Sequence, residues 1–152
     1  MTEPLDDVEG RVWRALARAL VVVPRDLETD LQRESGLTLG EYQVLVILSE
    51  SPERRCRMTE LASLVGLSAS RMTRLIAALT ARGDTTRMRD GCDRRGMSAV
   101  LTDAGFARLE RAYPAHLTSV RARVLDPLRA VDAEALAAAL EELAGPIPQL
   151  KG

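Results

Sequence analysis

The fold of this chain is decided by residues 58–105, which read MTELASLVGLSASRMTRLIAALTARGDTTRMRDGCDRRGMSAVLTDAG. Thr59 to Val65 is a short amphipathic segment, and it ends at Gly66, the residue type that best takes a left-handed C-terminal cap. Three residues then turn the chain, and Ser68 can cap a second helix. The apolar side chains of this second helix share one face; they are Met72, Leu75, Ile76 and Leu79.

The opposite face of the second helix is polar and carries hydroxyls and arginines. Two helices joined by a turn of about three residues are typical of a helix-turn-helix, whose second helix enters the major groove of DNA. We expect contacts with base edges and phosphates, because arginine bonds guanine bidentately and hydroxyls reach bases or phosphate oxygens. The alternative is a merely solvated face. The expected contacts are Ser68, Ser70, Arg71, Thr73 and Arg74.

A β-hairpin follows the second helix. Thr85 to Arg89 has the β-branched start of a strand, Asp90-Gly91 is a strong turn dipeptide, and Met97 to Leu101 reads as the returning strand. Such a hairpin projects beside the second helix as a wing. Its arginines are predicted to contact DNA; they are Arg87, Arg89, Arg94 and Arg95.

The wing also carries a family resemblance. The run Asp90-Gly91-Cys92-Asp93-Arg94-Arg95, followed by Val100-Leu101-Thr102 and Gly105, resembles the wing signature of the MarR family of winged-helix regulators. In that family an Asp-Pro-x-Asp-Arg-Arg run precedes Leu-Thr-x-x-Gly. Upstream, Gly36-Leu37-Thr38 leading into Tyr42 is similar to the start of the family's second helix, and the likeness runs over roughly residues 13–143.

The resemblance implies roles for the wing residues. Arg94 would contact the minor groove, Asp93 would hold the wing arginines by ion pairing, and Arg95 could face either way. Two positions depart from the family pattern. Gly91 stands where the family often has Pro, and Asp84-Thr85 stands where apolar residues usually begin the wing strand.

Composition and charge fit this interpretation. The 152 residues are 46% hydrophobic and 28% charged, as in an ordinary globular domain, and no apolar run is long enough to span a bilayer, so we expect a cytoplasmic protein. Residues 53–95 contain ten Arg and five Asp or Glu, a net charge of +5. Since the whole chain carries −1, the remainder carries −6. Phosphate attraction is therefore concentrated in the predicted reading head.

The flanking segments predict long helices. An apolar stripe runs through residues 9–36, where Pro24 either kinks one helix or opens a second. Thr38 and Glu41 form a capping box for the next helix. After the wing, Thr102 can cap a long helix with a bend at Pro114, and Asp132 can cap a last helix.

These helices predict a dimer. A winged helix-turn-helix at 38–101 needs only about half of the chain, and it cannot bury the apolar stripes of 9–36 and 102–145. The terminal helices of two copies would interlock symmetrically, which sets two recognition helices about one DNA turn apart, roughly 34 Å, on a palindromic site. The alternative is a monomer whose ends pack on its own winged helix.

Other candidate sites are less distinct. Regulators of the MarR family commonly respond to small aromatic or anionic molecules, so Trp13, Tyr42 and His116 could line a ligand pocket, with Arg14 or Arg18 pairing an acid. Trp13 could equally be core, and His116 a structural residue. The arginines before the helix-turn-helix lie in a predicted loop and either touch phosphate or are merely exposed; they are Arg54, Arg55 and Arg57.

The cysteines and the single histidine limit the chemistry. With Cys56, Cys92 and one His, a zinc site is a weak hypothesis, and we expect no metal or cofactor. Cys92 lies among wing arginines that would stabilise a thiolate, so a thiol switch is an alternative to an inert cysteine. We expect no enzyme, because a phosphate loop and a nucleophile with its base are missing.

The sequence therefore predicts a mostly α chain with a small β-wing, a winged helix-turn-helix flanked by N- and C-terminal dimerisation helices. Its expected function is transcription regulation, as a homodimeric repressor of a palindromic operator in double-stranded DNA, released by a small molecule. Two alternatives stay open: a thiol-based redox sensor, and a winged-helix interaction module that does not bind DNA.

Overall fold

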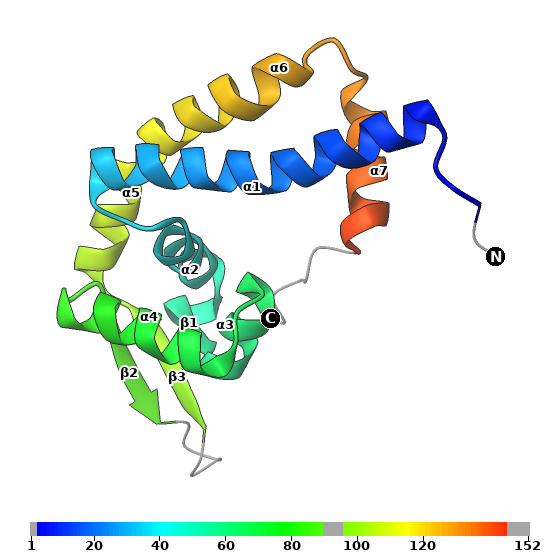
Figure 1. Ribbon diagram of the computed structural model, residues 1–152. Helices are drawn as coiled ribbons and strands as arrows, with labels where there is room; N and C mark the ends of the chain where they lie inside the picture. The colour runs from blue at the N-terminus through cyan, green and yellow to red at the C-terminus, as the bar shows by residue number, and fades with distance from the viewer. Residues whose placement is uncertain (1–2, 90–95, 146–152) are drawn as a thin grey trace.

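A computed structural model describes residues 3–89 and 96–145 of the chain (Figure 1). In the view of Figure 1, α1 crosses the upper part of the molecule, α5 rises along its left side, α7 hangs at the right, and the winged-helix lobe, residues 38–101, lies below α1. In chain order the elements are α1 (Asp7–Ser35), α2 (Leu39–Glu50), a 3₁₀ turn (Pro52–Arg54), β1 (Arg55–Arg57), α3 (Met58–Val65), α4 (Ala69–Ala81), β2 (Thr85–Arg89), β3 (Met97–Leu101), α5 (Asp103–Val120), a π-helical turn (Arg121–Leu125), α6 (Asp126–Leu128) and α7 (Ala133–Ala144). This mostly helical fold with a small β-wing confirms the predicted fold class.

The helix starts follow local capping chemistry. Thr38 and Glu41 form the predicted capping box of α2: the Thr38 hydroxyl accepts from the Glu41 N–H at 3.1 Å, and the Glu41 carboxylate accepts from the Thr38 N–H at 2.9 Å. Ser68 caps α4, Thr102 caps α5 and Asp132 caps α7. Each cap satisfies backbone donors that the first helical turn leaves free, which fixes where the helix begins.

The sheet has three antiparallel strands in the order β1-β3-β2. Strands β2 and β3 form the predicted hairpin, with Thr85 opposite Leu101 and Arg89 opposite Met97. Strand β1 was not predicted, because Arg55–Arg57 was expected to be loop. It pairs with β3 through Cys56, which lies opposite Ala99 and is only 5% exposed. Three residues with two arginines give too short a pattern to indicate a strand.

The core lies where α2, α3 and α4 meet β3 and α5. Leu45, Leu61, Ile76 and Ala99 are among its completely buried side chains. The polar Ser98, on β3, is also buried. The apolar face predicted for the second helix of the helix-turn-helix is therefore the face that α4 packs into this core.

The base of the wing contains a buried carboxylate where the MarR family usually has an apolar residue. Asp84 is 1% exposed, and its carboxylate accepts from Arg108 Nε of α5 at 2.8 Å and from Arg82 Nε at 3.3 Å. Arg82, directly after α4, also pairs with Glu41 of α2 at 2.7 Å. These four residues form a charged network, and it accommodates the departure noted at Asp84 because the buried charge is paired and hydrogen-bonded.

The neighbouring Thr85 is also buried, at 1% exposure. Its hydroxyl is 3.0 Å from the hydroxyl of Thr80 on α4. The start of β2 is therefore attached to α4 by a polar contact in place of the apolar packing that is usual in the family.

Helix α1 is one continuous helix that contains Pro24, so the proline does not open a second helix. Asp30 of α1 is bonded to α5 and the turn after it: its carboxylate accepts from Ser119 Oγ at 2.5 Å and from Arg123 Nε at 2.6 Å. These hydrogen bonds, with that of Arg123 the stronger, hold the pKa of Asp30 well below its usual range. The contact fixes α1 against α5.

The outer parts of the terminal helices do not reach the core. Along the N-terminal half of α1, Val12, Trp13 and Leu20 are each about 60% exposed, and α7 has no buried residue. In Figure 1, α7 and the N-terminal part of α1 lie to the right of the winged-helix lobe, whereas the C-terminal part of α1 packs against α2 and contributes Leu31 to the core. None of the helices within residues 3–89 and 96–145 has the length and apolar content needed to cross a lipid bilayer.

Candidate nucleic-acid interface

Helix α4 presents the predicted polar face to solvent. Its N-terminus is fixed by Ser68, whose hydroxyl accepts from the Arg71 N–H at 3.4 Å, and burial of Met72 and Ile76 sets its rotation. All five predicted contact residues of this region are exposed; they are Ser68, Ser70, Arg71, Thr73 and Arg74. The structure therefore brings these side chains together on the solvent side of one helix.

The hydroxyls of this face have partners of their own. The Thr73 hydroxyl donates to the Ala69 carbonyl at 2.9 Å, and the hydroxyls of Ser68 and Ser70 are 3.3 Å apart. A hydroxyl that donates internally still has lone pairs, so Thr73 is prepared to accept from a base amino group. Arg71 and Arg74 form no ion pair within the described residues and can accept an anionic partner.

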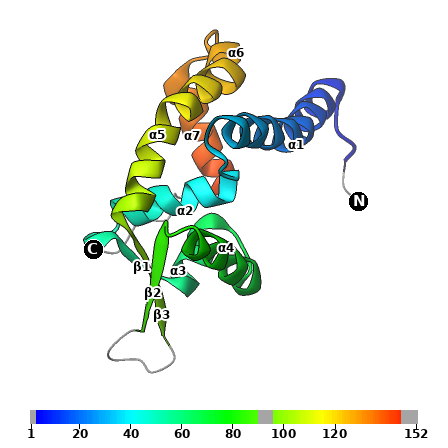
Figure 2. The same ribbon diagram turned by 90° about the vertical axis from the view of Figure 1, so that its left-hand side faces the viewer.

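The wing is bonded to α4. Arg87 of β2 donates from Nη2 to the Thr73 carbonyl at 3.2 Å, so the strand and the helix are positioned as one unit. Arg87 and Arg89 are both exposed on β2. Figure 2 shows the hairpin projecting beside α4. The predicted wing residues Cys92, Asp93, Arg94 and Arg95 lie outside the described residues.

The three arginines before α3 were predicted to lie in a loop, but the structure places them in a 3₁₀ turn and in strand β1. Arg54 is half-buried; its Nη1 pairs with Asp103 at 3.0 Å, and its guanidinium lies 4.2 Å from the centre of the Phe106 ring. Arg54 and Glu53 both adopt φ of 53°, a left-handed conformation that turns the chain into β1. Arg55 and Arg57 belong to β1 and also have partners. Arg54 therefore connects the turn before β1 to α5.

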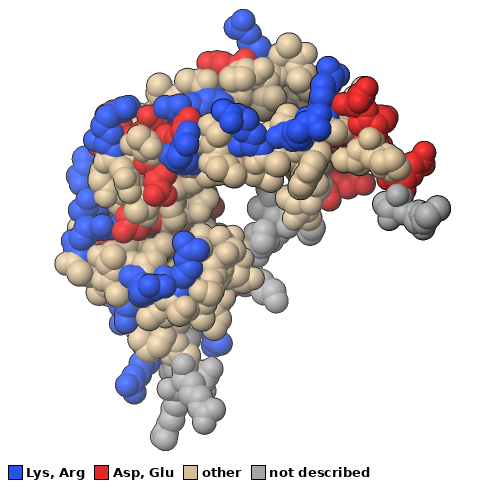
Figure 3. Space-filling model, viewed as in Figure 1, with Lys and Arg blue, Asp and Glu red and all other residues tan. Residues whose placement is uncertain are grey.

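The charge distribution is uneven over the face seen in Figure 3. Basic side chains lie over α4 and beside the wing, and also along α1 and the left side of the molecule, whereas acidic side chains gather at the N-terminal end of α1 (Figure 3). A basic surface around an exposed helix attracts a polyanion and raises its local concentration. The geometry and the charge of the winged-helix lobe are those of a DNA-reading surface.

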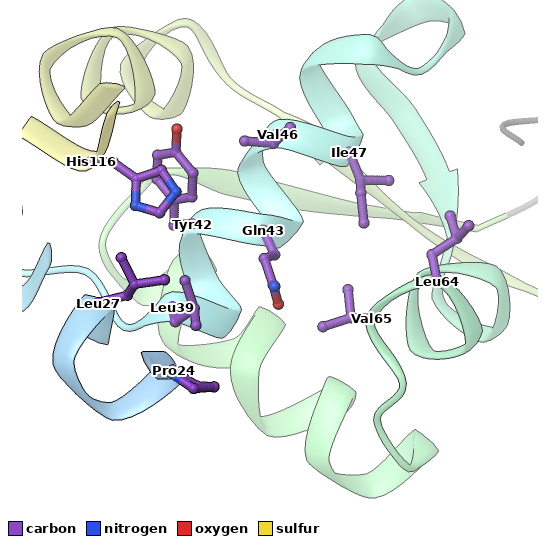
Figure 4. A pocket seen from close by; sticks show the side chains of 10 residues that line it. All are labelled: Pro24, Leu27, Leu39, Tyr42, Gln43, Val46, Ile47, Leu64, Val65 and His116. Atoms are coloured by element: carbon purple, nitrogen blue, oxygen red, sulfur yellow. The ribbon is translucent and has the colours of Figure 1, made fainter. Parts of the chain in front are cut away.

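A second candidate region lies where α2 meets α1 and α5. The ring centres of Tyr42 and His116 are 4.3 Å apart at an angle of 44°. They line a pocket of about 530 Å³ whose other walls are mainly apolar, including Leu27, Val46 and Val65 (Figure 4). The structure thus brings together two of the three residues predicted for a ligand pocket.

The third residue, Trp13, lies elsewhere. It is 59% exposed and lines a shallow apolar groove on α1 with Leu5, Val8 and Val12. Neither Arg14 nor Arg18 lines the pocket beside Tyr42 and His116. All of these residues lie on helices that the sequence predicts, α1, α2 and α5. Their spacing along the chain does not show that the groove at Trp13 and the pocket at Tyr42 and His116 are separate.

The chemistry of the remaining candidates is limited. Cys56 is buried, and burial raises the pKa of its thiol to about 11, which disfavours the reactive thiolate. Within residues 3–89 and 96–145, no three or more His, Cys, Asp and Glu side chains cluster as metal ligands would.

These features define a winged helix-turn-helix protein. Comparison with known proteins identifies the family: residues 35–96 match the family model described as MarR family, and the chain is 34% identical to Sco3205, a MarR family transcriptional regulator from Streptomyces coelicolor whose crystal structure was determined in complex with DNA. That match covers 99% of this chain and 95% of Sco3205, with a TM-score of 0.89. The chain belongs to the MarR family of winged helix-turn-helix transcriptional regulators.

Two further relatives agree. AbsC, a MarR family transcriptional regulator from Streptomyces coelicolor, is 35% identical over 96% of this chain and 95% of its own, with a TM-score of 0.83. The HTH-type transcriptional repressor YetL from Bacillus subtilis is 32% identical over 87 residues. Those residues are 57% of this chain and span only about half, 52%, of YetL.

Proposed function

We propose that this protein is a homodimeric repressor that binds a palindromic operator, with α4 in the major groove and the wing along the adjacent minor groove. The observation that carries the proposal is the exposed polar face of α4. Arg71 and Arg74 on this face form no ion pair with another described residue, and the Arg87 side chain donates to the Thr73 carbonyl. Support also comes from Sco3205, whose structure contains DNA. In this proposal Arg71 and Arg74 reach bases or phosphates. The wing arginines approach the DNA backbone or the minor groove, and Asp93 holds them by ion pairing; they are Arg87, Arg89, Arg94 and Arg95.

The dimer is proposed from unburied apolar surface. The N-terminal half of α1 exposes Val12, Trp13 and Leu20, and α7 exposes Leu140 and Leu143. Faces of this kind on two separate helices are costly in water at about 25 cal/mol per Å² of apolar area, and a second copy would cover them. A twofold axis through these helices would set two copies of α4 on one side of the dimer, where successive major grooves of DNA can receive them.

Release by a small molecule is proposed for the pocket beside Tyr42 and His116, which is formed by elements that connect α1 and α5 to the winged-helix lobe. A ligand that binds one arrangement of these helices better than another would shift the spacing of the two recognition helices. The walls carry no Lys or Arg among the described residues, which favours an aromatic ligand over an anionic one.

The test of DNA reading is selection of genomic fragments by the purified protein, followed by titration with salt. We expect a palindrome with half-sites about one turn apart and an affinity that falls by several powers of ten per tenfold rise in salt. Arg74→Ala should weaken operator binding by about 1–3 kcal/mol. The matched control is Arg129→Ala, an exposed arginine after α6 at the far end of the molecule from α4.

Two outcomes would oppose the proposal. If no fragment is selected even at low salt, from protein refolded to remove any bound ligand, the winged helix has another partner. If Arg74→Ala binds as tightly as Arg129→Ala, Arg74 does not belong to the reading surface. The dimer is tested separately by the mass of the protein in solution, where Leu20→Asp should shift a dimer toward monomer and weaken operator binding.

A further inference from the structure

The helix α4 and the wing are joined by a short connection that we call the wing base. Helix α4 ends at Ala81 and strand β2 begins at Thr85, so the wing base consists of Arg82, Gly83 and Asp84. Gly83 adopts a φ of 82°, a left-handed conformation that glycine takes without strain. The wing base therefore sets the angle between α4 and the wing, the two elements that are proposed to contact DNA.

The first turn of α5 packs directly on the backbone of the wing base. The Thr102 N–H and hydroxyl both donate to the Asp84 carbonyl, at 3.1 and 3.0 Å, and the same hydroxyl donates to the Gly83 carbonyl at 2.7 Å. Gly105 lies so close that an added Cβ atom would overlap the Asp84 carbonyl oxygen. Figure 2 shows α5 rising from the wing strands at this point. Movement of α5 is therefore transmitted to the wing base.

Arg108 of α5 holds the side chain of the wing base. Its Nε donates to the Asp84 carboxylate at 2.8 Å, and because the Asp84 side chain is only 2% exposed, water and salt screen this ion pair little. Asp84 also pairs with Arg82, which reaches Glu41 of α2 at 2.7 Å, but Arg82 belongs to the wing base itself. Arg108 is therefore the side chain through which α5 fixes the wing base from outside.

Farther from the wing base, the wing is held less firmly. Arg87 of β2 donates to the Thr73 carbonyl of α4 at 3.2 Å, but Arg87 is exposed, so water competes for this hydrogen bond. A small rotation at the wing base grows along β2, because each residue of a strand adds about 3.3 Å of length. Arg89, at the end of β2, would be displaced most.

We propose that Arg108 is a positioning residue for DNA binding. By holding Asp84 it fixes the angle between the wing and α4, so that Arg89 and Arg74 reach one DNA duplex together. Arg108 itself would not contact DNA. The inference rests on the proposed function, because it requires that both α4 and the wing bind the operator.

The test measures the affinity of the full-length protein for the selected operator duplex, at a temperature where circular dichroism shows every variant to be folded. Arg108→Met keeps the aliphatic stem but removes the charge, and we expect it to weaken operator binding about tenfold. Arg108→Lys keeps a cation beside Asp84 and should recover part of this loss.

The matched control is Arg111→Met, which makes the same change in net charge on the same helix. Arg111 is exposed and forms no ion pair with another described residue. Its replacement should therefore leave operator affinity within about twofold of the unmutated protein, as surface substitutions usually do.

A double-mutant cycle separates a misplaced wing from a weakened fold. Arg89→Ala and Arg74→Ala are each introduced into the unmutated protein and into Arg108→Met. If Arg108 positions the wing, Arg89→Ala should lose most of its effect on operator affinity in the Arg108→Met background, whereas Arg74→Ala should keep its full effect. A fold that is merely less stable would leave both effects unchanged.

The role of Arg108 is refuted if Arg108→Met binds the operator as tightly as Arg111→Met, or if Arg89→Ala has the same effect in both backgrounds. In either case the unmutated protein still binds its operator, so the proposed function stands and only the positioning role is wrong. If the unmutated protein binds no operator at all, the proposed function fails and the positioning role fails with it.

Discussion

The charged network at the base of the wing gives the sharpest prediction about stability. Asp84→Asn keeps the size of the side chain and one acceptor oxygen, but it removes the negative charge that faces Arg82 and Arg108. The asparagine amide group would also turn a donor toward one of the two guanidiniums. Arg108 would then lose its ion pair with Asp84, and Arg82 would keep only the ion pair with Glu41.

The magnitude follows from the burial of the three groups. A hydrogen bond to a charged group is worth about 1.5–3 kcal/mol, and Asp84 forms two. The arginine side chains are 34% and 30% exposed, so water compensates part of the loss. We therefore expect Asp84→Asn to lower the free energy of unfolding by about 2–3 kcal/mol, which corresponds to about 5–10 °C in melting temperature for a domain of this size.

The assay is thermal unfolding followed by circular dichroism at fixed protein concentration, since dimer formation would make the melting temperature depend on concentration. Asp103→Asn is the matched control. Asp103 forms an ion pair with Arg54 at 3.0 Å, but its side chain is fully exposed, so the loss of stability should be much smaller than that of Asp84→Asn. If Asp84→Asn destabilises the protein no more than Asp103→Asn, the network does not hold the wing base and our reasoning about buried charge is wrong.

Three further predictions concern other parts of the fold. Gly105→Ala should unfold or severely destabilise the protein, by about 3 kcal/mol, in the same melting assay, because a Cβ atom there would overlap the carbonyl oxygen of Asp84. Folding lowers the pKa of Asp30, so its ionised carboxylate stabilises the fold above pH ~4, and this contribution is lost as the pH falls toward the folded pKa. Between pH 6 and pH 3, the free energy of unfolding of the unmutated protein should therefore decrease more than that of the Asp30→Asn variant. In a Cys92→Ser background, Cys56 should react with iodoacetamide at pH 8 about a hundredfold more slowly in folded than in urea-unfolded protein, because its pKa is raised to about 11; equal rates would contradict its burial.

Elements whose signals are local could be predicted from the sequence. The caps at Thr38, Ser68, Thr102 and Asp132 depend on a side chain and a backbone group only three residues apart, so their spacing is visible in the chain. The apolar face of α4 is likewise a periodic pattern. These features suffice for a helix-turn-helix with a wing, which is why the fold class was predictable.

Elements that depend on distant residues could not be predicted. Strand β1 exists because β3, more than 40 residues later, pairs with Arg55–Arg57. The roles of Asp84 and Asp30 depend on Arg108 and Arg123, and no spacing in the sequence connects them. The pocket beside Tyr42 and His116 likewise needs side chains from α1, α2, α3 and α5 to meet.

The unburied helix α7 has a consequence for the lifetime of the protein in a cell. A helix of 12 residues with no buried side chain has little to hold it folded in a single copy, because isolated helices of that length are marginal in water. In an unassembled copy this segment would unfold readily and offer an apolar, extended chain to proteases. If the protein forms the proposed dimer, pairing would protect this segment, and degradation would remove unpaired copies first.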